Sequence, residues 1–168
     1  MAQDALLTVF PLLMAYAAAS DLLTMTIPNR LSLLLVAAFA VMALMGGLGS
    51  EVLLMHIGAG LLVLAVTFAM FAFGWIGGGD AKLAAATALW LGFGTLPDYL
   101  IIASLLGGVL TFAILVMRRH SLPAFVQGWT PIARLHNPNC GVPYGIALAA
   151  AALVVYPASP VWAALVNA

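Results

Sequence analysis

The hydrophobic residues of this 168-residue chain fall into six long runs separated by polar breaks. The runs cover residues 5–20, 31–48, 52–75, 81–96, 99–117 and 142–162. A helix that crosses a bilayer needs about 20 mostly apolar residues, and helices of roughly 17–25 are tolerated. The pattern therefore predicts an all-α fold: a polytopic membrane bundle of about six transmembrane helices, forming a single domain over residues 1–168.

The composition of the chain indicates which solvent the surface of the folded protein contacts. Hydrophobic residues make up 65% of the chain and charged residues 6%, with a mean hydropathy of +1.19. A soluble domain carries about 25% charged residues, so we expect most of the surface to contact membrane lipids. The net charge is zero, which provides no basic surface for nucleic acid.

The basic residues all follow odd-numbered runs, which places them on one side of the membrane. Lys and Arg are retained in cytoplasmic loops, so we expect three cytoplasmic loops and both termini outside. Residues 118–141 mix apolar and basic side chains and are expected to lie in the cytoplasmic interface. The five basic residues are Arg30, Lys82, Arg118, Arg119 and Arg134.

Two acidic residues, Asp21 and Asp80, lie on the predicted cytoplasmic side, one at the end of the first run and one before the fourth. A charged side chain at membrane depth costs about 2.5–3.5 kcal/mol on insertion scales, so it usually has a function. Two carboxyl groups that share a site hold one proton between them and can supply a general base and a general acid. The sequence does not assign these two roles, because such a pair titrates as a unit.

Each acid also has a purely structural interpretation. Asp80 follows three glycines, 77–79, and falls near the start of a predicted helix, where Asp is a preferred capping residue. The glycines give backbone freedom and room for a close approach. Asp21 alone could simply end a helix at the interface. Lys82 has two interpretations. It either lies beside the acids, where it would stabilise their charge or bind an acidic group of the substrate, or extends to the membrane interface as an orientation residue.

Taken together, three motifs resemble the type IV prepilin peptidases. Residues 20–22 (Ser-Asp-Leu) with 27–29 (Ile-Pro-Asn) resemble the motif around the first aspartate of that family. Residues 77–83 (Gly-Gly-Gly-Asp-Ala-Lys-Leu) resemble its Gly-x-Gly-Asp motif, and 142–145 (Val-Pro-Tyr-Gly) the opening of its last helix. The order of the motifs and the six-run layout agree with the family over nearly the whole chain.

This resemblance implies an aspartic endopeptidase of the bacterial inner membrane. It would remove the leader peptide from prepilins or pseudopilins at the cytoplasmic face, with Asp21 and Asp80 as catalytic residues and Gly77, Gly79 and Lys82 around them. Long members of the family also N-methylate the product and carry paired Cys-x-x-Cys motifs. This chain has one cysteine, so we expect the short, peptidase-only branch that serves Flp-type pili.

The sequence is also compatible with other functions. The same acids could serve a small proton-coupled transporter or an archaeal-type preflagellin peptidase, and the chain could also be a non-enzymatic subunit of a pilus machine. The three histidines show no metal-ligand spacing, so neither a metal nor another cofactor is expected. The sequence does not indicate an oligomeric state or which prepilin is cleaved. The histidines are His56, His120 and His136.

Overall fold

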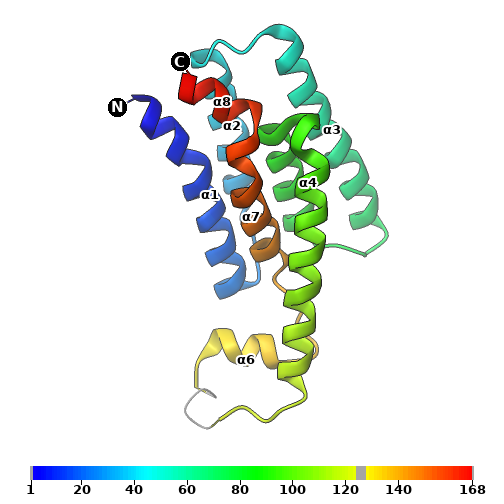
Figure 1. The fold of residues 1–168 in the computed structure, drawn as a ribbon. Coiled ribbons are helices and arrows are strands. Elements are labelled where there is room, and N and C mark those ends of the chain that lie inside the picture. The colour runs from blue at the N-terminus through cyan, green and yellow to red at the C-terminus, as the bar shows by residue number, and fades with distance from the viewer. Residues whose placement is uncertain (1, 124–127, 168) are drawn as a thin grey trace.

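The computed structural model describes residues 2–123 and 128–167, and side chains over 7–123 and 128–166. The chain is 82% helical, and the described residues contain no strand. The all-α prediction is therefore confirmed (Figure 1). The elements are α1 (Ala2–Thr24), α2 (Asn29–Met45), α3 (Ser50–Ala72), α4 (Gly78–Arg118), α6 (Thr130–His136), α7 (Tyr144–Val155), the 3-10 helix η1 (Tyr156–Ala158) and α8 (Pro160–Asn167).

The helices run up and down along a common direction, and both termini lie at one end of the molecule (Figure 1). Helix α4 packs against α2, α3 and α7, and α1 packs against α2 and α7. The lower part of α4 extends beyond the other long helices, and α6 lies across this opposite end. The start of α2, the start of α7 and the end of α1 therefore share the end of the bundle that faces α6.

One predicted boundary is wrong. The fourth and fifth runs, 81–96 and 99–117, were expected to be separated at residues 97–98, but Pro97 lies inside α4. The chain reverses instead at Gly92, whose φ of 66° and ψ of 176° are not helical. Such a conformation is essentially restricted to glycine. The first arm of α4 therefore ends before Gly92, and the second arm runs back alongside it (Figure 1).

Three further boundaries differ from the predictions. Helix α1 continues to Thr24, so Asp21 lies within the helix and not in the break after it. The last run, 142–162, divides into α7, η1 and α8, with a bend of 52° at the break. Helix α6 occupies part of the predicted interfacial loop 118–141, of which residues 124–127 lie outside the described residues.

Within the described residues, three helices are long and apolar enough to cross a membrane, at Leu7–Thr24, Ser50–Ala72 and Gly78–Arg118. The bent pair Tyr144–Ala158 and Pro160–Val166 makes a fourth candidate, and Asn29–Met45 is apolar but shorter. Six separate spans and their sidedness are not confirmed and stay predictions.

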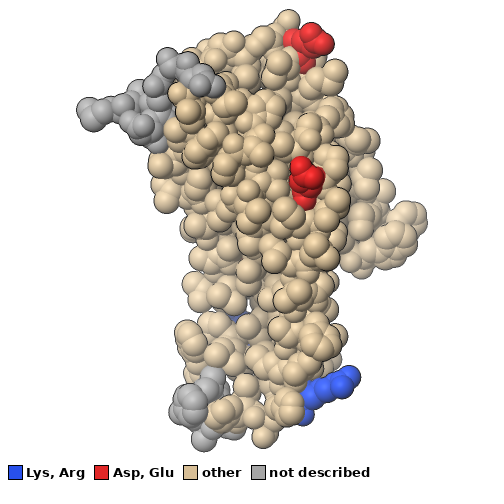
Figure 2. Space-filling view, viewed as in Figure 1, with Lys and Arg blue, Asp and Glu red and all other residues tan. Residues whose placement is uncertain are grey.

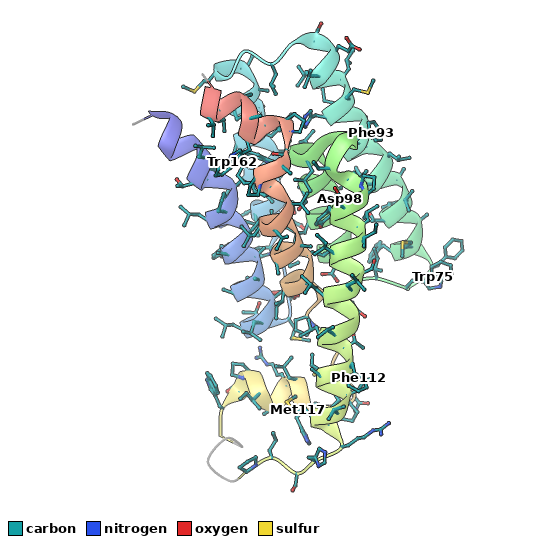
Figure 3. The ribbon with its side chains drawn as sticks, in the orientation of Figure 1. Trp75, Phe93, Asp98, Phe112, Met117 and Trp162 are labelled. Carbon is teal, nitrogen blue, oxygen red and sulfur yellow. The ribbon has the colours of Figure 1, made fainter. Side chains whose placement is uncertain are left out.

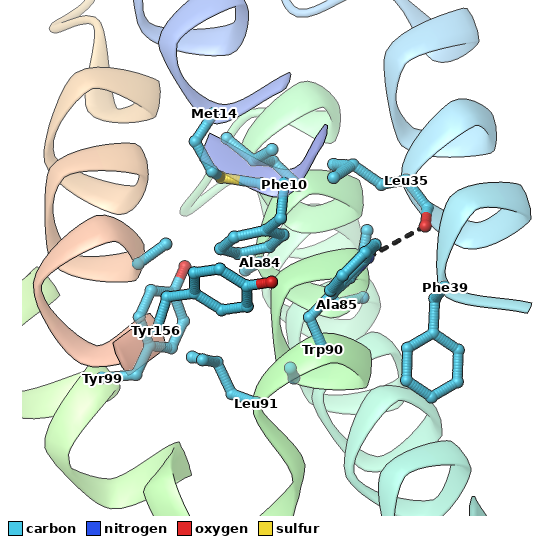
Figure 4. Close-up of a cluster of buried hydrophobic side chains, with 14 of the residues drawn as sticks. Phe10, Met14, Leu35, Phe39, Ala84, Ala85, Trp90, Leu91, Tyr99 and Tyr156 are labelled. Carbon is cyan, nitrogen blue, oxygen red and sulfur yellow. Dashed lines mark hydrogen bonds between the residues drawn. The ribbon is translucent and has the colours of Figure 1, made fainter. Parts of the chain in front are cut away.

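The core is an aromatic cluster that joins α1, α2, α4 and the end of α7 (Figure 4). The Phe10 ring lies 4.9 Å from Trp90 and 4.5 Å from Tyr156, measured between centroids. The Trp90 indole N–H donates to the Leu35 carbonyl at 2.9 Å, so its buried polar atom is satisfied. The buried alanines of the first arm of α4, at Ala84 and Ala88, allow neighbouring helices to approach closely.

The outer surface carries large apolar side chains and few charges. Trp75 and Phe112 project away from the bundle in Figure 3 and are 72% and 70% exposed. On the face drawn in Figure 2, acidic side chains lie towards the end that holds the termini and basic ones towards the α6 end. A surface of this kind fits lipid better than water.

Candidate active site

The first candidate acid, Asp21, is buried near the end of α1, with 5% of its surface exposed. Met25 ends the helix in the left-handed region, with φ of 56°, and its N–H donates to the Asp21 carbonyl at 2.8 Å. The Ser20 hydroxyl then donates to the Thr26 carbonyl at 2.9 Å. This tight turn brings Ile27 back beside Asp21.

The second candidate acid, Asp80, is half-buried in the first turn of α4. Its carboxylate accepts a hydrogen bond from the Gly77 N–H, the capping residue of the helix. A side chain that reaches back in this way satisfies one of the free N–H groups at a helix start. The expectation that Asp80 lies at the N-terminus of a helix is confirmed.

The glycines before Asp80 are explained by close packing within the protein. A Cβ atom on Gly77 would lie 2.9 Å from Asp80 Oδ2, and one on Gly79 would lie 3.1 Å from the Cβ of Ile27. A Cβ on Gly78 would lie 3.2 Å from the Phe71 ring. The room that the glycines leave is thus taken by Asp80 itself and by side chains of neighbouring segments.

Asp21 and Asp80 meet at one end of the bundle, within electrostatic range of each other. Asp21 Oδ2 accepts a hydrogen bond from the Gly145 N–H at 2.7 Å. A Cβ on Gly145 would lie 2.8 Å from both Asp21 Oδ2 and Ile27 Cδ1, and Ile27 also contacts Gly79. The end of α1 and the starts of α4 and α7 therefore form one neighbourhood around two carboxyl groups.

Gly145 is a site residue that the sequence interpretation missed. The motif 142–145 resembles the opening of the family's last helix, but this resemblance assigns no role to Gly145. In the structure Gly145 lies in the first turn of α7, where backbone N–H groups have no partner within the helix. Asp21 supplies that partner, and the helix dipole favours its negative charge there.

Two of the arginines, Arg118 and Arg134, make specific contacts within the protein. Arg118 Nε donates to the Leu135 carbonyl at 2.7 Å, and its Nη2 donates to the carbonyls of Cys140 and Gly141 at 2.8 and 3.1 Å. Arg134 Nη1 donates to the Leu23 carbonyl at 3.0 Å, which connects α6 to the end of α1. These contacts fix the segment that leads into α7.

Lys82 contacts neither acid through a hydrogen bond in the described part of the chain. Its Nζ donates to Asn29 Oδ1 at 2.8 Å, at one end of a groove of about 500 Å³ between α2, α3 and α4. Successive helical residues are rotated by about 100°, so Lys82 and Asp80 project from different sides of α4. The other lining residues are almost all apolar. Gly60, Ala85 and Ala86 have small side chains or none, which leaves one part of the groove open.

His56 lies away from the acids and supports the reversal of α4. Its Nδ1 donates to the Leu89 carbonyl at 2.9 Å, and a Cβ on Gly92 would lie 3.0 Å from its ring. Its ring also stacks on Phe39, with centroids 5.6 Å apart. His56 is therefore a structural residue that satisfies a carbonyl freed by the break.

The sequence model of the type IV leader peptidase family matches residues 8–112. The match includes both acids and the Gly-x-Gly-Asp motif, and it ends before the 142–145 motif. No curated protein and no solved structure gives a significant match. Because the family match covers more than half of the chain, this protein belongs to the type IV leader peptidase family. Membership indicates a multi-pass membrane peptidase that acts on prepilin-type substrates.

Proposed function

We propose that this protein removes the leader peptide from Flp-type prepilins or pseudopilins through activation of water by Asp21 and Asp80. The observation that carries the proposal is the meeting of these two acids at one end of the bundle, each bonded to a backbone N–H at a helix start. Those N–H groups orient the carboxyl groups without occupying both oxygens. We propose that the remaining carboxyl oxygens bind the water and the substrate.

The chemistry needs one shared proton and one water molecule. The ionised carboxyl group takes a proton from the water, whose oxygen forms a bond to the scissile carbonyl carbon. The protonated carboxyl group donates to the carbonyl oxygen, giving a neutral tetrahedral intermediate. Collapse of that intermediate breaks the C–N bond: the leaving amine takes a proton from the pair, and one hydroxyl of the intermediate returns a proton to the pair, which restores the single shared proton. The products are a leader with a new carboxyl group and a shortened pilin.

The substrate is expected to reach the acids from the α6 end, with its leader on the cytoplasmic side of the inner membrane. The apolar groove beside Lys82 offers a surface for the helix that follows the cleavage site. Because Lys82 and Asp80 project from different sides of α4, the scissile segment has to pass around the start of that helix in an extended form. Lys82 would then bind an acceptor group of the substrate.

The chain has one cysteine, so we propose peptidase activity without N-methylation. A proton-coupled transporter is supported less well, because its acids should follow a path from one membrane face to the other. Asp21 and Asp80 lie together at one end.

The proposal is tested by co-expressing the protein with a Flp-type prepilin and following leader removal on a gel. Wild type should remove the leader and leave an unmethylated N-terminus, which mass spectrometry identifies. Asp21→Asn and Asp80→Asn should insert normally and leave the prepilin uncut, whereas Asp98→Asn, at an exposed acid in the second arm of α4, should cleave like wild type. Normal cleavage by both active-site variants would contradict the assignment.

A further inference from the structure

The hydrogen bond from Gly145 to Asp21 depends on where α7 begins. Asp21 Oδ2 and the Gly145 nitrogen are 2.7 Å apart, so a small shift of the helix start would break the bond. Residues 137–143 precede the helix without regular structure. Something outside this segment must therefore fix the position of the Gly145 N–H.

The second arm of α4 supplies two anchors for this segment. At its lower end the half-buried Arg118 donates to three carbonyls, those of Leu135, Cys140 and Gly141. A guanidinium presents several N–H groups in a rigid fork and can hold several acceptors at once. Cys140 and Gly141 come only five and four residues before Gly145, so Arg118 holds the chain directly before α7.

The second anchor is Tyr144, the residue next to Gly145. Its hydroxyl lies 2.9 Å from Thr111 Oγ1, and its ring packs where a Cβ on Gly107 would lie, 3.0 Å from Tyr144 Cε1. Gly107 and Thr111 are one turn apart on α4, so they face Tyr144 from the same side. A methyl group at residue 107 would therefore push the ring by a few tenths of an ångström.

We propose that Arg118 and Tyr144 are positioning residues that orient the Asp21 carboxyl group through the backbone of residues 140–145. The inference rests on the proposed function of Asp21. Neither residue touches the substrate: each holds the Gly145 N–H, which in turn holds one carboxyl oxygen and leaves the other directed at the reaction. Arg118 lies beyond residues 8–112, which match the family model.

The kinetic test uses two matched pairs, measured with purified protein in liposomes. Arg118→Lys keeps the charge but loses the fork, and we compare it with Arg119→Lys at the exposed neighbour. Gly107→Ala displaces the Tyr144 ring, and we compare it with Gly108→Ala, where a Cβ meets nothing within 4 Å. We expect Arg118→Lys and Gly107→Ala to lower kcat about 10- to 100-fold with KM within about twofold, because small displacements at a reacting group have effects of this size. Both controls should match wild type.

A second readout is independent of cleavage. In protein labelled with ¹⁵N-glycine, the Gly145 amide resonance, assigned as the signal lost in Gly145→Ala, should shift in Asp21→Asn. It should shift in the same direction in Arg118→Lys and Gly107→Ala, and stay in place in the two controls. If the wild type cleaved no prepilin, the proposed function would fail, and this shift would still decide whether Arg118 and Tyr144 position Asp21.

Two results would overturn the inference. One is an unchanged Gly145 resonance in Arg118→Lys and Gly107→Ala. The other is a wild-type kcat per folded molecule in both variants, with folded protein quantified by thermal unfolding. In that case Arg118 would only hold α6 and the segment after it in place.

Discussion

Asp21 and Asp80 are oriented by the same kind of interaction, a hydrogen bond from a backbone N–H at the start of a helix. Gly145 at the start of α7 donates to Asp21, and Gly77 at the start of α4 donates to Asp80. Both glycines are needed sterically, because a Cβ on either would lie within 3.0 Å of a carboxyl oxygen. The orientation of the acids is thus encoded partly by residues that have no side chain.

This interaction predicts that adding one methyl group at residue 77 lowers the rate of cleavage. Gly77 caps α4 with φ of −72° and ψ of 145°, which alanine adopts freely, so only the Asp80 carboxyl group has to move. We expect Gly77→Ala to lower kcat at least about tenfold, by misplacing a reacting group. Gly49→Ala is the matched control, since Gly49 caps α3 with a similar φ of −58° and has nothing within 4 Å of its added Cβ. Equal cleavage rates for the two variants would contradict the geometry.

At this scale, the sequence alone predicts the two acids but not what orients them. Asp21 and Asp80 stand out because charged side chains are expensive near a membrane and because their motifs resemble a known family. The donor to Asp21 is a backbone N–H, 124 residues away in the chain, and any residue but proline carries such a group. No side-chain pattern could therefore identify Gly145 as the donor.

Among the elements, α4 determines the arrangement of the site. Its first arm carries Asp80 in its first turn, its reversal at Gly92 returns the chain along the bundle, and its second arm ends at Arg118. The reversal frees the Leu89 carbonyl, which His56 satisfies. The fold therefore depends on one glycine and one buried histidine far from the acids.

The reversal predicts opposite effects for two glycines that are close in sequence. Gly92→Ala places a Cβ in a backbone conformation that costs roughly 1–3 kcal/mol and 3.0 Å from the His56 ring. Its thermal unfolding temperature in detergent should fall. Gly94→Ala meets nothing within 4 Å and should be neutral or stabilising by up to about 1 kcal/mol, as alanine is in helices. A Gly92→Ala protein as stable as Gly94→Ala would show that the reversal lies elsewhere.

The misplaced break illustrates why element boundaries were hard to predict. Pro97 and Asp98 look like a turn, since proline lacks an N–H and breaks helix interiors. In the structure Pro97 lies five residues after Gly92, near the start of the second arm, and the helix continues through it. Gly92 is surrounded by apolar residues, and its positive φ depends on tertiary packing against His56.

For the whole molecule, the distribution of charge agrees with a membrane protein in which basic side chains lie towards one end and exposed acidic side chains towards the other (Figure 2). Asp21 and Asp80, at the end of α1 and the start of α4, meet towards the end that carries α6. The termini lie at the other end (Figure 1). Composition was enough to predict an all-helical membrane bundle. The number of spans was not, because α4 joins two predicted runs and α7, η1 and α8 divide another.

The predicted sidedness can be tested by cysteine labelling in a Cys140→Ser background. An impermeant maleimide added to intact spheroplasts should label a cysteine at Gly49, in the α2–α3 connection, but not one at Arg119. After permeabilisation it should label both, because the positive-inside rule places the arginine-rich end in the cytoplasm. The reverse pattern would place the acids on the outer side and would contradict cytoplasmic cleavage.

The most direct test of the central claim asks whether Asp21 and Asp80 act as one unit. Cleavage rates of a Flp-type prepilin would be measured in liposomes for wild type, Asp21→Asn, Asp80→Asn and the double variant, with Asp98→Asn as control. Residues that act together are strongly non-additive, so each single variant should lose at least about 100-fold in rate, and the double variant should lose no more. Single variants that keep the wild-type rate, or losses that multiply in the double variant, would contradict a two-aspartate site.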